Sequence, residues 1–369
     1  MIARCRPGEI RDAIVDYLSH CALPATVKQI TDAVGARFPR EIAPSSIRSY
    51  LRLNTPEFFE RIGRGQYCLK GMPQERTTDQ REPFLPVFSY NRAELFQADC
   101  FDWLASREPD SIHGVVTDPP YGLVEYSAGE QRKLRAGRGG VWRIPPSFDG
   151  HKRAPLPRFT VLDRDDLANL EDFFRRWTRV LLPVLVPGAH VAVASNPLLS
   201  YLVAGAMVGG GFERRGEIIR LVTTMRGGDR PKNAHEEFSG VSVMSRSMWE
   251  PWLLFRKPVE GRVQDNLRKW KTGGLRRPSA QRPFGDVIKS HPTPKRERAL
   301  APHPSLKPQG FLRQVVRAIL PLGEGIVLDP FAGAGSTLAA AEVAGYQSIG
   351  IEKDPHYIEI ARKAIPALA

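Results

Sequence analysis

Apolar and polar positions follow two different patterns along the chain, and the change comes near residue 84. Before it, three segments carry apolar side chains at helical spacing, and a fourth reads as two strands around a glycine turn. These segments are residues 7–18, 26–38, 43–54 and 58–70. A polar stretch with prolines near both ends follows them. We therefore predict a small domain at 1–70, a linker at 71–83 and a large domain at 84–369.

The small domain is predicted to be a winged helix-turn-helix. The apolar side chains of each helix fall on one face. They are Ile10, Ile14, Tyr17 and Leu18, then Val27, Ile30 and Val34, then Ile47, Tyr50 and Leu51. Arg48 and Arg52 lie four residues apart on the outer face of the third helix, which reads the DNA groove in such domains. A protein-interaction module is the alternative, because no residue pattern separates the two.

The large domain alternates strand and helix patterns, which predicts an open, mostly parallel α/β sheet with helices on both faces. Several of its strands are almost wholly apolar, as strands covered on both faces are. The predicted strands are 93–99, 111–118, 188–195, 216–222, 250–256, 325–329 and 347–352, and the predicted helices are 165–182, 305–320, 334–344 and 355–365. In such a sheet ligands bind beyond the carboxyl ends of the strands.

Positive charge is concentrated in two segments. The net charge is +13, and residues 130–158 carry a balance of +6 and residues 262–298 a balance of +8. A nearly neutral body with two basic segments favours a polyanionic partner, because neutralising phosphate is the main use of such patches. A solvated basic tail is the alternative. Aromatic rings within both segments favour the first interpretation, since bases stack on such rings.

Other features narrow the class of protein. Cys5, Cys21, Cys68 and Cys100 are widely spaced and form no CxxC pair, so we expect neither a disulfide framework nor a zinc ribbon. The N-terminus lacks the apolar core of a signal peptide, and the most apolar segment, 180–194, is short and contains two prolines. We expect a cytoplasmic protein with no membrane contact and no bound metal.

The most specific stretch runs from residue 326 to residue 354. An apolar strand ends at Asp329, a loop with Gly333 and Gly335 follows, and the next strand ends at Glu352. Glycine lets a backbone approach a ligand closely, and an acid at the end of the second strand suits the hydroxyls of a ribose. The spacing matches neither GxGxxG nor a P-loop, which excludes a dinucleotide enzyme and a P-loop ATPase.

A second stretch, TDPPYG at 117–122, follows a buried strand. Its prolines fix φ and lack N–H donors, so the turn presents carbonyl oxygens in a stiff shape beside the Asp118 carboxylate. Such a turn can accept N–H bonds.

DPFAGAGST at 329–337, together with TDPPYG, resembles the S-adenosylmethionine-dependent amino-methyltransferases of DNA. In that family DPFxGxGT is the cofactor loop and (D/N/S)PPY the catalytic loop. The catalytic loop comes first here, which is similar to the permuted beta class, and residues 303–320 resemble the HPTxKP segment ahead of the cofactor loop. The resemblance covers about residues 90–365. It implies a Rossmann-like methyltransferase sheet, S-adenosylmethionine as cofactor and double-stranded DNA as partner.

The resemblance also implies roles for single residues. The catalytic loop would be Asp118, Pro119, Pro120 and Tyr121, which accept the N–H bonds of the target amine and stack on a flipped base. The residues that would line the cofactor are Asp329, Pro330, Phe331, Ala332, Gly333, Gly335, Ser336 and Thr337. Glu352 would hold the ribose, Lys307 and His303 the methionine end, and Asp99 the adenine, with Asp102 as a rival for the last role.

The two basic segments then gain a role as DNA contacts. We expect a basic loop at 125–160 and a target-recognition region at 223–300, where this class often places it. Arg, Lys, Asn and Gln in these segments are able to contact phosphate and base edges. The predicted DNA contacts are Arg48, Arg52, Arg226, Arg230, Lys269, Lys271, Arg276 and Arg277.

The identity of the target base is the most specific expectation. Within the family, aspartate as the first residue of the catalytic loop favours adenine N6 over cytosine N4, and cytosine N4 is the alternative. An RNA amino-methyltransferase and a catalytically silent DNA-binding regulator are further alternatives. The recognition sequence and the oligomeric state, with a homodimer as one option, stay open.

Overall fold

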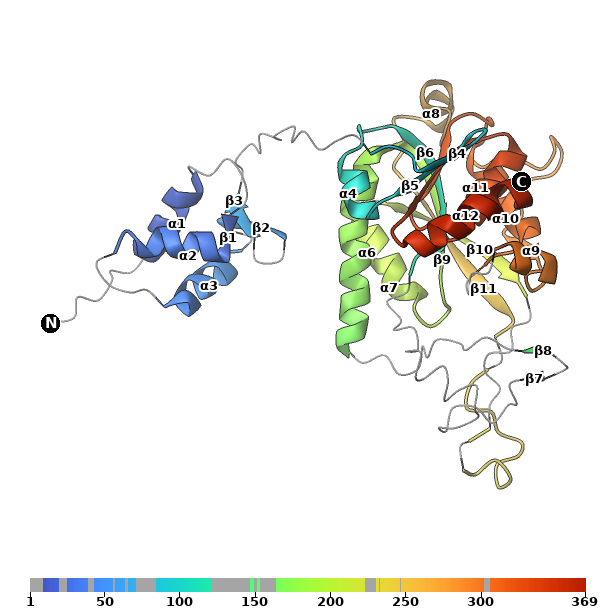
Figure 1. Cartoon of the computed structure of the whole chain (residues 1–369), viewed down its shortest axis with the longest axis horizontal. Coiled ribbons are helices and arrows are strands. Elements are labelled where there is room, and N and C mark those ends of the chain that lie inside the picture. The colour runs from blue at the N-terminus through green and yellow to red at the C-terminus, as the bar shows by residue number, and fades with distance from the viewer. Residues whose placement is uncertain are drawn as a thin grey trace. The chain divides into compact units, whose positions relative to one another are not determined.

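A computed structural model of the chain divides it into two compact units, Met1–Pro83 and Phe84–Ala369 (Figure 1). The structure describes residues 9–19, 25–38, 43–55, 57–63, 66–70, 84–120, 147–148, 151–152, 164–222, 230–231, 233–245, 247–301 and 306–369. No helix within these ranges is long and apolar enough to cross a membrane.

The first unit packs three helices against a small sheet. The helices are α1 (Glu9–Ser19), α2 (Val27–Gly35) and α3 (Pro44–Leu53). The strands β1 (Ala25–Thr26), β2 (Phe59–Gly63) and β3 (Gln66–Leu69) follow the order β1-β3-β2. Thr26 caps α2, since its hydroxyl accepts from Gln29 N and the Gln29 side chain accepts from Thr26 N. The predicted apolar faces are confirmed, because all ten of those residues join one core.

The second unit is built on a nine-stranded sheet of order β12-β10-β11-β9-β6-β13-β14-β5-β4. Its strands are β4 (Phe88–Tyr90), β5 (Ala93–Gln97), β6 (Ile112–Thr117), β9 (Leu185–Ala194), β10 (Glu213–Leu221), β11 (Trp249–Arg256), β12 (Val287–Lys289), β13 (Ile326–Asp329) and β14 (Gln347–Glu352). In this sheet only β4 and β11 run against the common direction. The predicted mostly parallel sheet is therefore confirmed. β7 (Ser147–Phe148) and β8 (His151–Lys152) pair separately.

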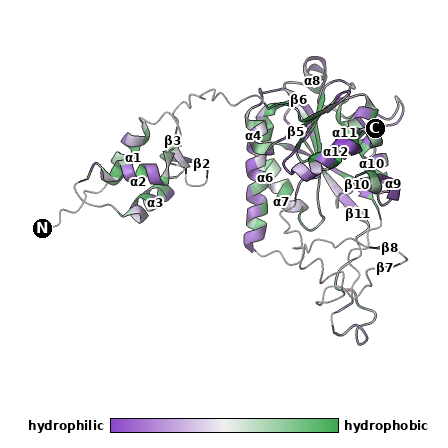
Figure 2. Cartoon of the chain, in the orientation of Figure 1, coloured by the Kyte–Doolittle hydropathy of each residue, from purple (hydrophilic) through white to green (hydrophobic). Residues whose placement is uncertain are grey.

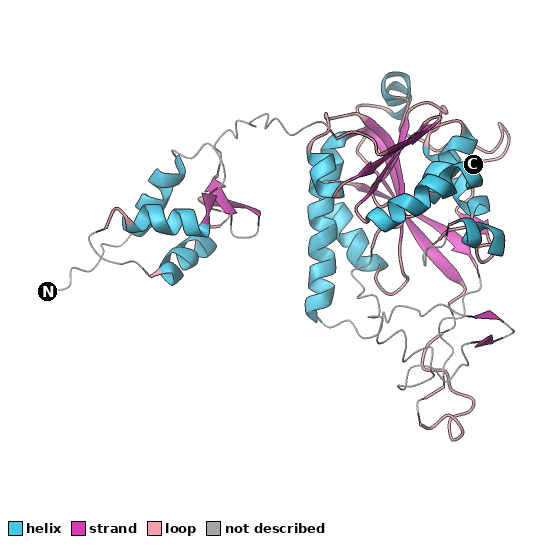
Figure 3. Cartoon of the chain, in the orientation of Figure 1, coloured by secondary structure: helices cyan, strands magenta, loops and turns pink. Residues whose placement is uncertain are grey.

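Helices cover both faces of this sheet (Figure 3). They are α4 (Cys100–Ala105), α6 (Arg164–Val184), α7 (Ser200–Gly209), α8 (Val263–Trp270), α9 (Lys295–Leu300), α10 (Gln309–Ile319), α11 (Ser336–Ala344) and α12 (Pro355–Leu368). Figure 2 shows hydrophobic colour along the strands and mixed colour along helices such as α6.

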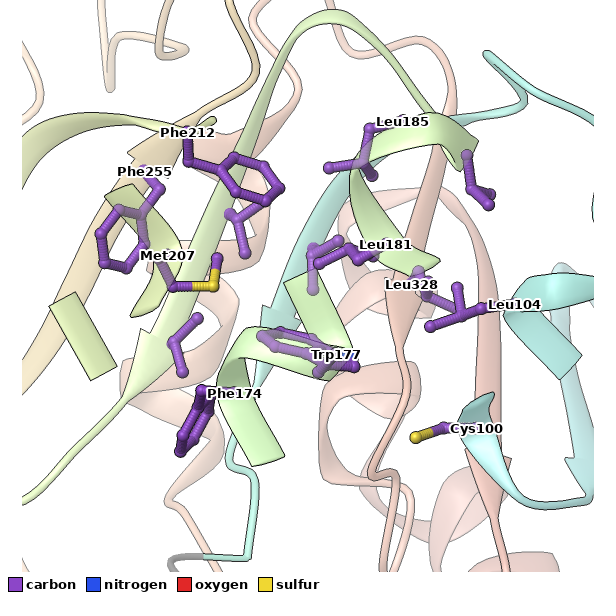
Figure 4. Packing of buried hydrophobic residues seen from close by; sticks show 14 of the residues in the cluster. Cys100, Leu104, Phe174, Trp177, Leu181, Leu185, Met207, Phe212, Phe255 and Leu328 are labelled. Carbon is purple, nitrogen blue, oxygen red and sulfur yellow. The ribbon is translucent and has the colours of Figure 1, made fainter. Parts of the chain in front are cut away.

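Alternate residues of the central strands enter two separate cores. Val115 of β6 joins the core beneath α4, α6 and α7, whereas Val116 joins the core beneath α10 and α11. Figure 4 shows the first of these cores, where Phe174 and Trp177 of α6 lie among residues from the strands and α7. A Cβ added at Gly114 would lie 2.3 Å from Ile319 Cγ2, so α10 packs directly on β6. This close packing fixes the start of α10 near the end of β6.

Candidate active site

Acidic residues stand at the carboxyl ends of four neighbouring strands. Asp118 follows β6, Asp329 ends β13, Glu352 ends β14 and Asp99 follows β5, and these strands are adjacent in the order β6-β13-β14-β5. The sheet thus brings together side chains that are more than 200 residues apart in sequence. This is the edge at which ligands bind in sheets of this kind.

A pocket opens at this edge between the glycine loop and the segment before α10. It is lined by Asp118, Trp252, Leu306, Lys307, Leu312, Asp329, Phe331, Ala332, Gly333, Ala334, Ser336 and Thr337. Most of the predicted cofactor loop lines it. Pro119 and Pro330 are buried beside it, and Pro120 is exposed.

The glycine loop turns sharply between β13 and α11. Gly333 has φ 50° and Gly335 has φ 77°, values that favour glycine. Gly333 N donates to Glu352 Oε2 at 2.8 Å, and Asp354 N donates to Glu352 Oε1 at 2.8 Å. Glu352 therefore holds the loop in place, and each of its oxygens keeps a further lone pair for a ligand hydroxyl.

Asp329 is buried at the base of the pocket. Its Oδ1 accepts from Thr117 Oγ1 at 2.7 Å and from Phe331 N at 3.2 Å. Burial raises the pKa of Asp329 to about 6, and the nearby Asp118 adds to the rise, against the hydrogen bonds from Thr337, Thr117 and Phe331. A cation placed in the pocket would favour the ionised form of this carboxyl.

Phe331 packs against aromatic residues of α6, and Asp99 caps α4. The Phe331 ring lies 5.9 Å from the Phe173 ring and 5.8 Å from the Trp177 ring, so α6 supplies an aromatic wall. Asp99 caps α4 by accepting from Phe101 N at 2.9 Å and pairs with Lys353 at 3.0 Å. Its rival Asp102 is exposed in the first turn of α4.

Lys307 and Asp118 form an ion pair at the mouth of the pocket. Their side chains are 13% and 17% exposed, and Lys307 Nζ also lies 3.8 Å from Glu250 Oε1. Burial by itself would lower the pKa of Lys307, but the carboxylates of Asp118 and Glu250 raise it above its ordinary value. The ammonium therefore stays charged at neutral pH.

Sequence reasoning missed Glu250, Trp252 and Arg220, which complete this corner. Glu250 and Trp252 stand at the start of β11, and β11 is antiparallel to its neighbours. Its amino end therefore lies at the carboxyl edge of the parallel strands. A search limited to the residues that end strands does not include the residues that begin β11. An acid and a tryptophan opening the run EPWLLFR were the available signal.

The predicted DNA contacts separate into several places. Arg48 and Arg52 are exposed on α3 of the first unit, and Arg230 is exposed in the segment between β10 and β11. Lys269 and Lys271 lie at the edge of the sheet opposite the site, because α8 is tied to the start of β9 (Figure 1).

Arg276 and Arg277 lie at that opposite edge as well. Arg276 N donates to Ala318 O at the end of α10, and its guanidinium bonds the Tyr346 hydroxyl, just before β14, at 2.7 Å. The described residues of the predicted region 223–300 therefore lie at both edges of the sheet. Tyr121, His303, Arg226 and most of the loop 125–160 lie outside the described residues.

A glycine turn between a buried strand and a helix, with an acid ending the next strand, defines a Rossmann-like enzyme that takes a nucleoside-type cofactor. Comparison with known proteins makes the class specific. A family model described as DNA methylase, named for N6 and N4 methyltransferases, matches residues 112–363.

The chain is similar to several known methyltransferases. The type II methyltransferase M.HinfI of Haemophilus influenzae is 37% identical over 274 residues, which cover 73% of this chain and 67% of that protein. M2.DpnII of Streptococcus pneumoniae is 24% identical over 290 residues, or 76% of this chain and 92% of that protein. The solved cytosine-N4-specific PvuII DNA methyltransferase overlaps 77% of this chain and 93% of its own at 13% identity, with a TM-score of 0.48.

The chain belongs to the DNA methylase family, and S-adenosylmethionine is its methyl donor. The pocket residues fit this donor. Gly333 presents backbone without a side chain, and buried Asp329 offers a carboxyl to a cationic ligand.

Proposed function

We propose that the chain methylates the exocyclic amine of a flipped base in double-stranded DNA, and that this base is adenine, at N6. The placement of Asp118 carries the proposal. This carboxylate stands at the carboxyl edge of the sheet, in the same pocket as the glycine loop and paired with Lys307. Aspartate as the first residue of the catalytic loop favours adenine, with cytosine N4 as the alternative.

S-adenosylmethionine supplies an electrophilic methyl group on a sulfonium. The exocyclic amine is a weak nucleophile, because its lone pair is delocalised into the ring. Asp118 and the Pro119 carbonyl accept its two N–H bonds, turn its lone pair toward the pocket and stabilise the positive charge that develops on nitrogen. Tyr121, in the same motif, would stack on the flipped base.

The remaining site residues bind and orient the donor in this proposal. Gly333, Gly335 and the start of α11 approach it closely, Glu352 receives the ribose hydroxyls and Asp99 lies near the adenine. Two observations support the last two roles. Glu352 is fixed by Gly333 N and Asp354 N, and Ala98 N donates to Glu352 O at 3.0 Å, which sets Asp99 beside it.

We infer that residues 1–70 form a winged helix-turn-helix that contacts DNA through Arg48 and Arg52 of α3, joined by the linker 71–83 to the methyltransferase domain 84–369. Three helices with a β1-β3-β2 sheet support the fold, and the division of the chain at residue 83 supports the boundary. Exposure of both arginines leaves them accessible to a duplex.

Transfer of labelled methyl groups to unmethylated duplex DNA, with the nucleosides resolved by mass spectrometry, tests the function. We expect N6-methyladenine. N4-methylcytosine would overturn the base assignment and keep the mechanism. Donor binding without any DNA product would favour an RNA substrate or a silent regulator.

The role of Asp118 is tested separately with Asp118→Ala. We expect kcat to fall by about a hundredfold or more, because the variant loses an acceptor aimed at developing charge. Donor affinity, measured by calorimetry, should stay close to that of the wild type. Asp265→Ala is the control, since Asp265 is an exposed acid on α8. Equal losses of donor binding and kcat in Asp118→Ala would contradict the assignment.

A further inference from the structure

Four charged side chains of alternating sign run from the carboxyl end of β10 to the catalytic loop. Arg220 Nη1 of β10 lies 3.0 Å from Glu250 Oε2 of β11, Glu250 Oε1 lies 3.8 Å from Lys307 Nζ, and Lys307 pairs with Asp118. Arg220 and Glu250 are directly opposite each other in the ladder between β10 and β11. The row therefore ends on the residue that the proposed function places against the target amine.

Glu250 is held rigidly in this row. Its Oε1 accepts from Trp252 Nε1 at 2.9 Å, and its Oε2 accepts from Arg220. Arg220, whose side chain is only 7% exposed, is itself fixed. It donates to Ser290 Oγ and to His291 O, each at 3.1 Å, and its guanidinium lies 5.6 Å from the centre of the Phe311 ring.

Lys307 is the adaptable member of the row. A lysine ammonium is a point charge on a flexible stem, so it can exchange partners with a small movement. It stands between two carboxylates, one in contact and the other at 3.8 Å. Glu250 cannot make the same exchange, because Trp252 and Arg220 hold both of its oxygens.

Asp118 serves two partners in this proposal. Its Oδ2 accepts from Lys307, and its Oδ1 can accept an N–H of the target amine, because an ionised carboxylate has about four lone-pair sites. Sharing its carboxylate with the amine weakens the hold of Asp118 on the buried Lys307 ammonium, and the Glu250 carboxylate at 3.8 Å offsets that loss.

We propose that Glu250 is a positioning residue for methyl transfer, which shares the Lys307 ammonium with Asp118 and holds it more strongly when the target amine binds Asp118. Arg220 and Trp252 hold Glu250 in place for this role. The proposal rests on the assigned role of Asp118. It adds to the site an acid from the antiparallel strand, outside both recognised motifs.

The raised pKa of Lys307 agrees with this role. The charged groups of the described residues that bear on the ammonium are Asp118 after β6, Glu250 of β11 and Arg220 of β10, and the two carboxylates outweigh the burial and the guanidinium. Removing the charge of Glu250 should therefore lower the pKa of Lys307. If the rate falls at high pH because Lys307 loses its charge, the alkaline limb of the rate profile should move to lower pH in a variant without the Glu250 charge.

The sheet contains a matched pair for a control. Arg256 and Glu213 also face each other between β10 and β11, with 2.6 Å between Arg256 Nη2 and Glu213 Oε2, but at the opposite end of the two strands. Arg256 is 8% exposed and Arg220 is 7% exposed, so the two guanidinium groups are equally buried. Glu213→Gln thus removes an equivalent cross-strand ion pair away from the site.

The experiment compares Glu250→Gln, Glu250→Asp and Glu213→Gln with the wild type in full-length protein. For Glu250→Gln we expect kcat to fall on the order of tenfold to a hundredfold, the scale of a misplaced catalytic group, with donor affinity unchanged and the alkaline limb moved to lower pH. Glu250→Asp restores the charge and should recover part of kcat. Glu213→Gln should keep kcat and its pH profile.

Each other result has a definite meaning. Wild-type kcat and pH profile in Glu250→Gln would overturn the proposal and leave the proposed function standing. Equal loss of kcat in Glu213→Gln, or an aspartate variant no more active than the glutamine variant, would reduce Glu250 to a structural part of the sheet. Absence of methyl transfer by the wild type would instead overturn the proposed function.

Discussion

At the scale of one residue, the raised pKa of Asp329 predicts that ligand binding depends on the protonation of this carboxyl. Its pKa is about 6 in the folded chain and 3.8 as an ordinary side chain, so part of the population holds it neutral near pH 6. The methyl donor carries a sulfonium and an ammonium, which favour the carboxylate. We therefore expect donor affinity to rise between pH 5 and pH 7, by at most about tenfold per pH unit. Calorimetric titration at several pH values measures this.

Asp329→Asn is the control for that titration, since its affinity should be flat over the same range. The sign for stability is opposite. Between pH 3.8 and about 6 the folded chain binds more protons than the unfolded chain, so the contribution of Asp329 to the free energy of unfolding falls as pH rises. A flat affinity in the wild type would show that Asp329 does not sense the cationic groups.

The acids recognised in the sequence were those next to a glycine or proline motif. Asp118, Asp329 and Glu352 follow apolar strands and precede turns, and a sequence displays both features. Arg220 offers no such mark. It is one of five charged residues in β10, and its role comes from Glu250, thirty residues away, which only strand pairing sets opposite it.

At the scale of elements, the two ends of α11 give a matched pair of glycines. Gly335 (φ 77°) begins the helix and Gly345 (φ 76°) ends it. A Cβ at Gly335 would lie 2.5 Å from Ile365 Cγ1 of α12, whereas a Cβ at Gly345 would meet nothing within 4 Å. Gly345→Ala should cost about 1 kcal/mol of backbone strain, and Gly335→Ala about 1–3 kcal/mol more for the collision. Urea unfolding of both variants measures the difference.

Equal costs for the two alanine variants would mean that α12 yields to the added methyl group. The same loop lines the pocket, so Gly335→Ala should also weaken donor binding, whereas Gly345→Ala should not. Loss of donor binding in both variants would contradict a local effect.

Periodicity predicted the long elements and missed others. All seven predicted strands and four predicted helices of the large domain appear, with ends shifted by up to four residues. β4 and β12 have only three residues each, too few to show alternation. α7 contains apolar and small residues on most sides, so it shows no helical stripe. The direction of β11 is invisible to any local pattern, which is why its first residues were not assigned to the site.

At the scale of the whole molecule, the sequence did not predict the order of the strands in the nine-stranded sheet. The region 223–300 was expected to be a target-recognition region, because the family that the chain resembles often places it there. In the fold this stretch begins at the site's edge after β10, passes through β11 to the opposite edge at α8, and returns along β12. Basic composition gives the sign of the partner's charge but cannot tell which edge of a sheet a loop reaches.

This division gives a final prediction about DNA affinity. Arg48 and Arg52 are exposed on the helix proposed to contact DNA, whereas Lys269 and Arg277 lie at the edge of the sheet opposite the site, where Lys269 already pairs with Glu260 at 2.7 Å. We expect Arg48→Ala with Arg52→Ala to weaken binding to any duplex. The slope of log affinity against log salt should become shallower by about 1–2, since each lost phosphate contact removes about 0.9.

Lys269→Ala with Arg277→Ala removes the same charge and should leave affinity and slope unchanged. Fluorescence anisotropy of a labelled duplex over a range of salt concentrations measures both variants, and kcat at saturating DNA separates binding from chemistry. Equal weakening by the two double variants would mean that the duplex also reaches the edge opposite the site. No effect of Arg48→Ala with Arg52→Ala would assign the first unit to a protein partner, because an exposed basic helix that ignores salt and duplex alike cannot be a groove reader.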